Sequence, residues 1–134
     1  YTGNNRTHMI RVPDAGRFEL RLMDGSSNPY LLQAGVIAAG LHGLKNKIDP
    51  GEPLSCNMYT DYKNYPNLKK LPNEIQGALD FLENSKELKE AFGDNIINSY
   101  IKLKNMEIED FNKHNNFDKK AAVTDWEKNN TLDC

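Results

Sequence analysis

The chain has 134 residues and a formal net charge of −2 at pH 7. This length is enough for one domain with a modest hydrophobic core. The near balance of charge gives no reason to expect nucleic acid or an anionic membrane as a partner. The two cysteines lie far apart, and the first residues lack the charged start and apolar run of a signal peptide. We therefore expect free thiols and a cytoplasmic protein.

The basic residues are segregated by type along the chain. The four arginines are Arg6, Arg11, Arg17 and Arg21, and all the lysines follow them. A guanidinium is a planar fork that binds phosphate or carboxylate through two parallel hydrogen bonds, whereas the ammonium of lysine is a mobile point charge. The local concentration of arginine indicates a site for a small anionic ligand, and the lysines indicate ordinary surface charge.

Two strands are predicted around a tight turn. Residues 7–12 have the β-branched and apolar content of a strand, and residues 17–22 have the alternation of a second one. Pro and Gly in residues 13–16 favour the turn between them. The second strand alternates between charged and apolar side chains, so each kind occupies one face. The charged face carries Arg17, Glu19 and Arg21, and the apolar face carries Phe18, Leu20 and Leu22. The sequence therefore predicts an antiparallel hairpin with a charged upper side and an apolar underside.

The charged face of this hairpin predicts oxyanion and metal chemistry. A glutamate between two guanidiniums should ionise readily, because nearby positive charge favours the carboxylate. Such a carboxylate can take one position on Mg²⁺, while the arginines neutralise phosphates that the metal does not reach. Because the spacing of Arg6 and Arg11 is odd, we expect Arg6 to lie before the strand. The alternative is a solvated strand face with ordinary ion pairs.

The rest of the chain is predicted to be mostly helical, which gives the α+β class. A helix begins at Asn28 and Pro29 as N-cap and first helical residue, and ends near His42 with Gly43 as C-cap. It is apolar nearly all round, so segment 28–44 is expected to be a buried helix. A long irregular loop follows over residues 45–72. Residues 73–134 form a helical subdomain and tail, with helices expected at 75–82, 85–92, 94–111 and 119–128.

Four motifs in this order resemble those of the glutamine synthetases. They are N-R-T-H-M-I-R-V-P at residues 5–13, R-F-E-L-R at 17–21, N-P-Y-L at 28–31 and G-L-K-N-K-I-D-P-G-E at 43–52. Each motif alone is weak, but the agreement in order and spacing is highly specific. The chain resembles the C-terminal third of a glutamine synthetase catalytic domain, from a divergent type I-like branch that includes γ-glutamyl-amide ligases. The resemblance implies that residues 1–27 are a hairpin and loop of the curved active-site sheet.

The resemblance implies a role for each residue of the charged cluster. Arg6 matches the arginine that stabilises the transferring γ-phosphoryl group, and Arg21 matches the residue that contacts glutamate. Both are therefore expected to be catalytic. Arg11 and Arg17, together with Arg6, match contacts to the phosphates of ATP. Glu19 matches a ligand of a divalent metal that bridges those phosphates. These roles agree with phosphoryl transfer as a reaction of positioning and electrostatic stabilisation.

The implied activity is ATP-dependent ligation of ammonia to the γ-carboxylate of L-glutamate through γ-glutamyl phosphate. ATP and Mg²⁺ (or Mn²⁺) are the implied cofactors, and the full-length enzyme is expected to be a homo-oligomer, a ring-based dodecamer. The isolated chain, which carries only one metal carboxylate, is expected to be inactive.

Three questions stay open at this level. The short turn at residues 13–16 and the unmatched tail leave both the amine acceptor and the dodecamer undecided. One alternative is a γ-glutamyl ligase that uses methylamine, a polyamine or another amine, and another is a non-catalytic nucleotide- or partner-binding relative. Tyr59 lies where some bacterial relatives carry an adenylylated tyrosine, and the alternative there is an ordinary loop tyrosine.

Overall fold

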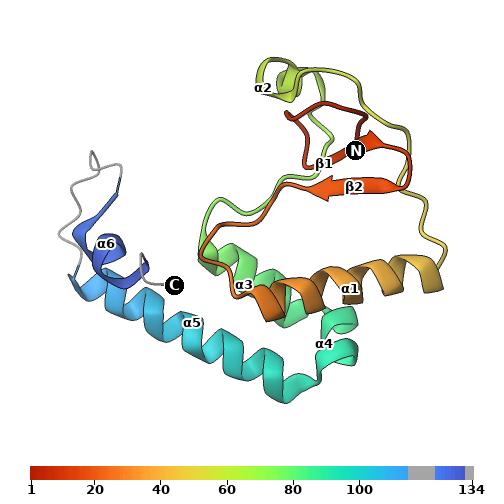
Figure 1. The fold of residues 1–134 in the computed structure, drawn as a ribbon. Coiled ribbons are helices and arrows are strands. Elements are labelled where there is room, and N and C mark those ends of the chain that lie inside the picture. Colours follow the sequence, from red (N-terminus) through yellow and green to blue (C-terminus); the bar gives the residue numbers. More distant parts are fainter. Residues whose placement is uncertain (115–122, 132–134) are drawn as a thin grey trace. The chain divides into compact units, whose positions relative to one another are not determined.

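The computed structural model describes residues 1–114 and 123–131 (Figure 1). Its elements are β1 (Ile10–Asp14), β2 (Arg17–Leu20), α1 (Pro29–Lys45), α2 (Met58–Asp61), the 3₁₀ turn η1 (Tyr62–Asn64), α3 (Ile75–Asn84), α4 (Lys86–Phe92), α5 (Asp94–His114) and α6 (Asp125–Thr131). A two-stranded antiparallel sheet is followed by helices, so the predicted α+β class is confirmed.

The chain divides into two compact units that interleave in sequence. The first unit joins Tyr1–Ser27 to Gly43–Lys70, and the second joins Asn28–His42 to the described residues from Leu71 on. The candidate site belongs to the first unit. None of the described helices combines the length and apolar character that crossing a bilayer requires.

The hairpin contains a bulge that proline explains. The paired residues are Ile10 with Leu20, Arg11 with Glu19, and Asp14 with Arg17, with a register shift between Arg11 and Asp14. Pro13 lies within that shift and has no N–H to give to the ladder, so β1 accommodates an extra residue there. The turn that follows uses Gly16 at a φ of 77°, a left-handed conformation that glycine adopts without strain.

The first residues of the chain add a third segment beside β1. Thr2 forms a parallel bridge with Arg11, the Thr2 N–H donates to the carbonyl of Ile10 at 3.1 Å, and the Val12 N–H donates to the carbonyl of Thr2 at 2.9 Å. Thr2 is buried as a result. This segment carries no strand pattern in its sequence, so only the tertiary pairing defines it.

Helix α1 begins as predicted but ends later than predicted. The side chain of Asn28 accepts hydrogen bonds from the N–H groups of Tyr30 and Leu31 at 3.0 and 3.1 Å, as an N-cap does. Gly43 is not the C-cap, because the helix continues to Lys45. The reversal occurs at Lys47, which has a φ of 51°.

The end of α1 is a Schellman motif with lysine at the left-handed position. The Ile48 N–H donates to the carbonyl of Gly43 at 2.9 Å, and the Lys47 N–H donates to that of Leu44 at 3.2 Å. These two bonds satisfy carbonyls that the helix leaves without partners, which is why the chain tolerates lysine at a position that favours glycine.

Replacing Lys47 with glycine is expected to stabilise the protein by about 0.5–1 kcal/mol, because glycine reaches positive φ without the Cβ clash. The free energy of unfolding from urea denaturation, followed by circular dichroism, would measure this gain. Lys45→Gly is the matched control: this residue has helical dihedrals, so glycine there should cost about 1 kcal/mol. Equal effects of the two substitutions would contradict the assignment of Lys47 as the reversal residue.

The expected burial of the helix over residues 28–44 stays a prediction, because it requires neighbours that the described residues do not provide. No residue of α1 is buried, and Tyr30 is 82% exposed. A helix that is apolar nearly all round needs neighbours on several sides, and the described part of the chain does not supply them.

The predicted helices of the second unit are present, with a small core. Leu79 of α3 and Ile97 of α5 are buried. The Ser85 side chain accepts from the Leu88 N–H at 3.2 Å and caps α4, and Gly93, at a φ of 81°, ends that helix. Helix α4 therefore lies within the predicted range 85–92.

Two predictions for the remaining segments need correction. Residues 45–72 are not wholly irregular, since α2 and η1 lie within them. Asn57 caps α2 by accepting from the Tyr59 N–H at 3.0 Å. Helix α6 starts later than the expected residue 119, at a capping box in which Thr124 and Glu127 bond each other's N–H groups. Residues 119–122 lie outside the described part of the chain.

Candidate functional site

The charged face of the hairpin carries a glutamate held between two arginines. An Nη1 atom of Arg11 lies 2.7 Å from Oε2 of Glu19, and an Nη1 atom of Arg21 lies 2.5 Å from Oε1. Arg11 faces Glu19 across the hairpin, and Arg21 is two residues along the chain, so all three project from the same face. The structure therefore brings together three of the five predicted cluster residues.

Arg11 is fixed from a second side by Asn4. The Asn4 side-chain oxygen accepts from Nε of Arg11 at 2.9 Å and also from Nη2. The Arg11 side chain is only 11% exposed. With its donors shared between Asn4 and Glu19, Arg11 holds the carboxylate in place. The sequence analysis missed Asn4, because the Thr2 bridge that brings it near Arg11 has no sequence signature.

Arg17 and Arg6 do not join this cluster. Arg17 is 66% exposed and lies 3.7 Å from Asp14, the residue that the bulge places opposite it. Arg6 is exposed and lies before β1, as the odd spacing predicted. Neither makes an ion pair with Glu19, and Arg17 pairs with Asp14 instead.

The two guanidiniums lower the pKa of Glu19. The hydrogen bond from Arg21 is the largest cause, followed by the bond from Arg11 and the charges of both arginines, and desolvation opposes them only in part. A depressed pKa means that these ion pairs are fully present above the ordinary glutamate pKa of about 4.3 and are lost as pH falls through the lower folded-state value.

We expect the NMR titration of the Glu19 side-chain carboxyl to have its midpoint below about 4.3, the ordinary glutamate value. In the Arg21→Ala variant the midpoint should move upward, because the largest cause of the depression is gone. Glu127, whose pKa is lowered by hydrogen bonds from the N–H and hydroxyl of Thr124, is the internal control and should keep the same midpoint in both proteins. An unchanged Glu19 midpoint in the variant would contradict the ion pair.

Glu19 fits a divalent cation as one ligand, not as a whole site. Each of its oxygens accepts one hydrogen bond and keeps a further lone pair for a metal. Among residues 1–114 and 123–131, no three His, Cys, Asp or Glu side chains cluster as a metal site needs. Any further ligands must come from substrate phosphate, water or residues other than these.

Tyr59 lies in the short helix α2 of the same unit. Its side chain is 74% exposed. It is accessible to a modifying enzyme, and exposure is equally expected of an ordinary loop tyrosine.

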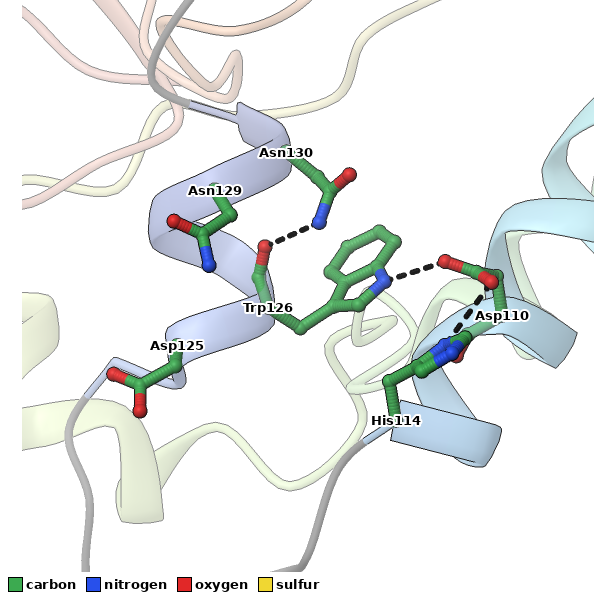
Figure 2. Close-up of a pocket in the computed structure, with 6 residues that line it drawn as sticks. All are labelled: Asp110, His114, Asp125, Trp126, Asn129 and Asn130. Atoms are coloured by element: carbon green, nitrogen blue, oxygen red, sulfur yellow. Dashed lines mark hydrogen bonds and ion pairs between the residues drawn. The ribbon is translucent and has the colours of Figure 1, made fainter.

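A separate cavity lies between α5 and α6 of the second unit (Figure 2). Its polar groups bond one another: the Trp126 indole N–H donates to Asp110 at 2.6 Å, and His114 lies 3.1 Å from the same carboxylate. Trp126 also packs edge-on against Phe111, with ring centroids 5.4 Å apart. This arrangement packs α6 against the end of α5, and it is not a candidate catalytic site.

This chain is similar to known proteins over nearly its whole length. Residues 1–130 match the family "Glutamine synthetase, catalytic domain". A glutamine synthetase of Rhizobium leguminosarum bv. phaseoli is 44% identical over 99% of this chain and 29% of its own length. A glutamate–methylamine ligase of Methyloversatilis universalis is 40% identical over 99% of this chain and 28% of its own length. A solved GmaS/ADP complex superposes with a TM-score of 0.80 at 40% identity, covering all of this chain and 29% of that one.

The chain belongs to the glutamine synthetase family and corresponds to part of its catalytic domain. It spans less than a third of the length of the relatives it matches. The predicted family is thereby confirmed.

Proposed function

We propose that the full-length protein is an ATP-dependent ligase that joins ammonia to the γ-carboxylate of L-glutamate through γ-glutamyl phosphate. The observation that carries this proposal is the position of Glu19, whose carboxylate makes ion pairs with both Arg11 and Arg21. Arg11, Glu19 and Arg21 all lie in motifs that resemble those of the family, and the two arginines hold the carboxylate of Glu19 between them. Phosphoryl transfer requires such positioned charge more than covalent chemistry from the protein.

Each residue of the cluster has a proposed role in that reaction. Arg21 binds glutamate and its phosphorylated carboxyl, and Arg6 stabilises charge on the transferring phosphoryl group. Arg17, with its exposed guanidinium, and Arg11 bind phosphates of ATP. Because Arg11 is occupied by Glu19 and Asn4, its contribution to the phosphates is made from a fixed position.

Glu19 is proposed as a ligand of Mg²⁺ or Mn²⁺. A cation held there would supply positive charge that neutralises nearby phosphate. Its lowered pKa keeps Glu19 ionised at neutral pH, which a metal ligand requires.

The amine acceptor decides between two branches of the family. Relatives of similar identity are a glutamine synthetase and a glutamate–methylamine ligase, so the second candidate is a γ-glutamyl ligase using methylamine, a polyamine or another amine. The test is phosphate release by the full-length protein from ATP and glutamate with ammonia, methylamine or a polyamine. Release with ammonia supports the synthetase, release with another amine alone supports the second branch, and no release refutes a ligase.

The remaining proposals concern the context of the site. We propose a cytoplasmic homo-oligomer, a ring-based dodecamer when full length, with small-molecule substrates and neither nucleic acid nor membrane as a partner. Cys56 is a free thiol, as expected for a reducing compartment, while Cys134 lies outside the described residues. Adenylylation of Tyr59 is proposed as regulation. The isolated 134 residues should be inactive, and measurable turnover by them would disprove this.

A further inference from the structure

The loop that carries Arg6 is tied to a segment about fifty residues further along the chain. Both segments belong to the first unit, where α2 lies beside the loop before β1 (Figure 1). Three neighbours of Arg6 make the connection through their side chains: Asn5, Thr7 and His8. We call this set the Arg6 latch.

The first half of the latch is a chain of hydrogen bonds through Thr7. The Met58 N–H donates to Oγ1 of Thr7 at 3.0 Å. That hydroxyl donates to Oδ1 of Asn5 at 2.8 Å, and the Thr7 N–H donates to the same oxygen at 2.9 Å. The amide nitrogen of Asn5 then donates to the carbonyl of Cys56 at 3.0 Å. Each N–H and O–H donor in this chain of bonds has an acceptor, so the direction of every hydrogen bond in it is fixed.

The second half of the latch is His8. Its Nε2 atom lies 2.8 Å from the carbonyl oxygen of Cys56. Because a carbonyl only accepts, Nε2 carries the proton, and Cys56 receives one hydrogen bond from Asn5 and one from His8. His8 is 7% exposed, so this bond is largely shielded from water. This part-buried bond is costly to break, because the N–H of the buried His8 ring would lose its acceptor.

The latch holds the backbone on both sides of Arg6, and the Arg6 side chain takes no part in its hydrogen bonds. The polar groups of Asn5, Thr7 and His8 point to Cys56 and Met58, whereas Arg6 is exposed and makes no ion pair within the described residues. The arrangement orders the loop without using the guanidinium, which stays free for a ligand.

We propose that Asn5, Thr7 and His8 are positioning residues that set the location of Arg6 for phosphoryl transfer, an inference that rests on the proposed function. A displacement of about 1 Å in a positioning element can reduce a rate by about 100-fold, so a fixed loop matters for a single long side chain. The latch also makes the location of Arg6 depend on the start of α2, because Met58 is its first residue.

The test uses phosphate release by the full-length protein with its preferred amine. Thr7→Val keeps the shape of the side chain and removes the hydroxyl, while Thr7→Ser keeps the hydroxyl. We expect kcat to fall about 10-fold or more in Thr7→Val, with the KM for glutamate changed less than about twofold, and to be largely restored in Thr7→Ser. Thr131→Val is the matched control, because that hydroxyl donates to the carbonyl of Glu127 within α6, away from the latch.

A double-mutant cycle separates positioning of Arg6 from general stability. In an Arg6→Ala background, Thr7→Val should lower kcat by less than about twofold further, because its target is already gone. An undiminished effect in that background would refute the latch as a device acting through Arg6. An unchanged kcat of Thr7→Val beside an active wild type would also refute the latch. If the wild type released no phosphate with any amine, the proposed function itself would fail, and this role of the latch with it.

Discussion

Replacing Arg21 with alanine in the full-length protein is expected to lower amine-dependent phosphate release by about 100- to 1,000-fold in kcat/KM. Arg21 donates to Glu19 and is the residue proposed to contact glutamate. Its loss would remove a positive charge that we propose acts on the reacting carboxyl, and it would remove one of the two ion pairs that hold Glu19. Steady-state kinetics with glutamate and ATP varied separately would measure the effect, and the larger rise in KM should be for glutamate.

Two further variants make this result specific. Arg21→Lys keeps the charge but not the planar fork, so it should recover only part of the activity. Lys104→Ala removes a cation that pairs with Glu107 on the surface of α5 and should leave the kinetics unchanged. A rise in KM for ATP alone would assign Arg21 to the nucleotide and contradict the proposed glutamate contact.

Glu19→Gln is expected to lower kcat by about 100-fold and to raise the Mg²⁺ concentration needed for half-maximal activity by about tenfold, since losing one support of a bound metal typically costs 10- to 100-fold. Glutamine has nearly the same shape but lacks the charge that a hard cation requires. Titration of activity with Mg²⁺, and then with Mn²⁺, would measure the shift.

The metal dependence separates two roles of Glu19. If the carboxylate served only to orient Arg11 and Arg21, the KM for glutamate would rise while the Mg²⁺ requirement stayed the same. That outcome would remove Glu19 from the metal site. Glu107→Gln makes the same chemical change at a surface ion pair and should alter neither quantity.

Local sequence signals predicted much of the fold. Asn28 and Ser85 begin helices as side-chain caps, and Gly93 ends one, because these effects act over three or four residues. The prediction for Gly43 was wrong for an instructive reason. Glycine permits a reversal of the chain but does not impose one. Here the chain reverses at Lys47, and the carbonyls of Gly43 and Leu44 accept the bonds that close the helix.

The candidate site was also predicted only where local patterns define it. The alternation at residues 17–21 placed Glu19 and Arg21 on one face, and the hairpin added Arg11. Asn4 could not be predicted, since it reaches Arg11 through a parallel bridge between segments without a shared pattern.

The sequence by itself determined the class, the charged face of the hairpin and the family, because period-two alternation, helix caps and ordered motifs are written in neighbouring residues. Only the tertiary structure decided that Arg11 is locked by Asn4, that Arg17 is left exposed by the bulge, and that Asn5, Thr7 and His8 fasten the Arg6 loop to Cys56 and Met58. These contacts join residues up to 51 positions apart. They depend on where the folded chain brings its backbone donors and acceptors, which no local pattern specifies.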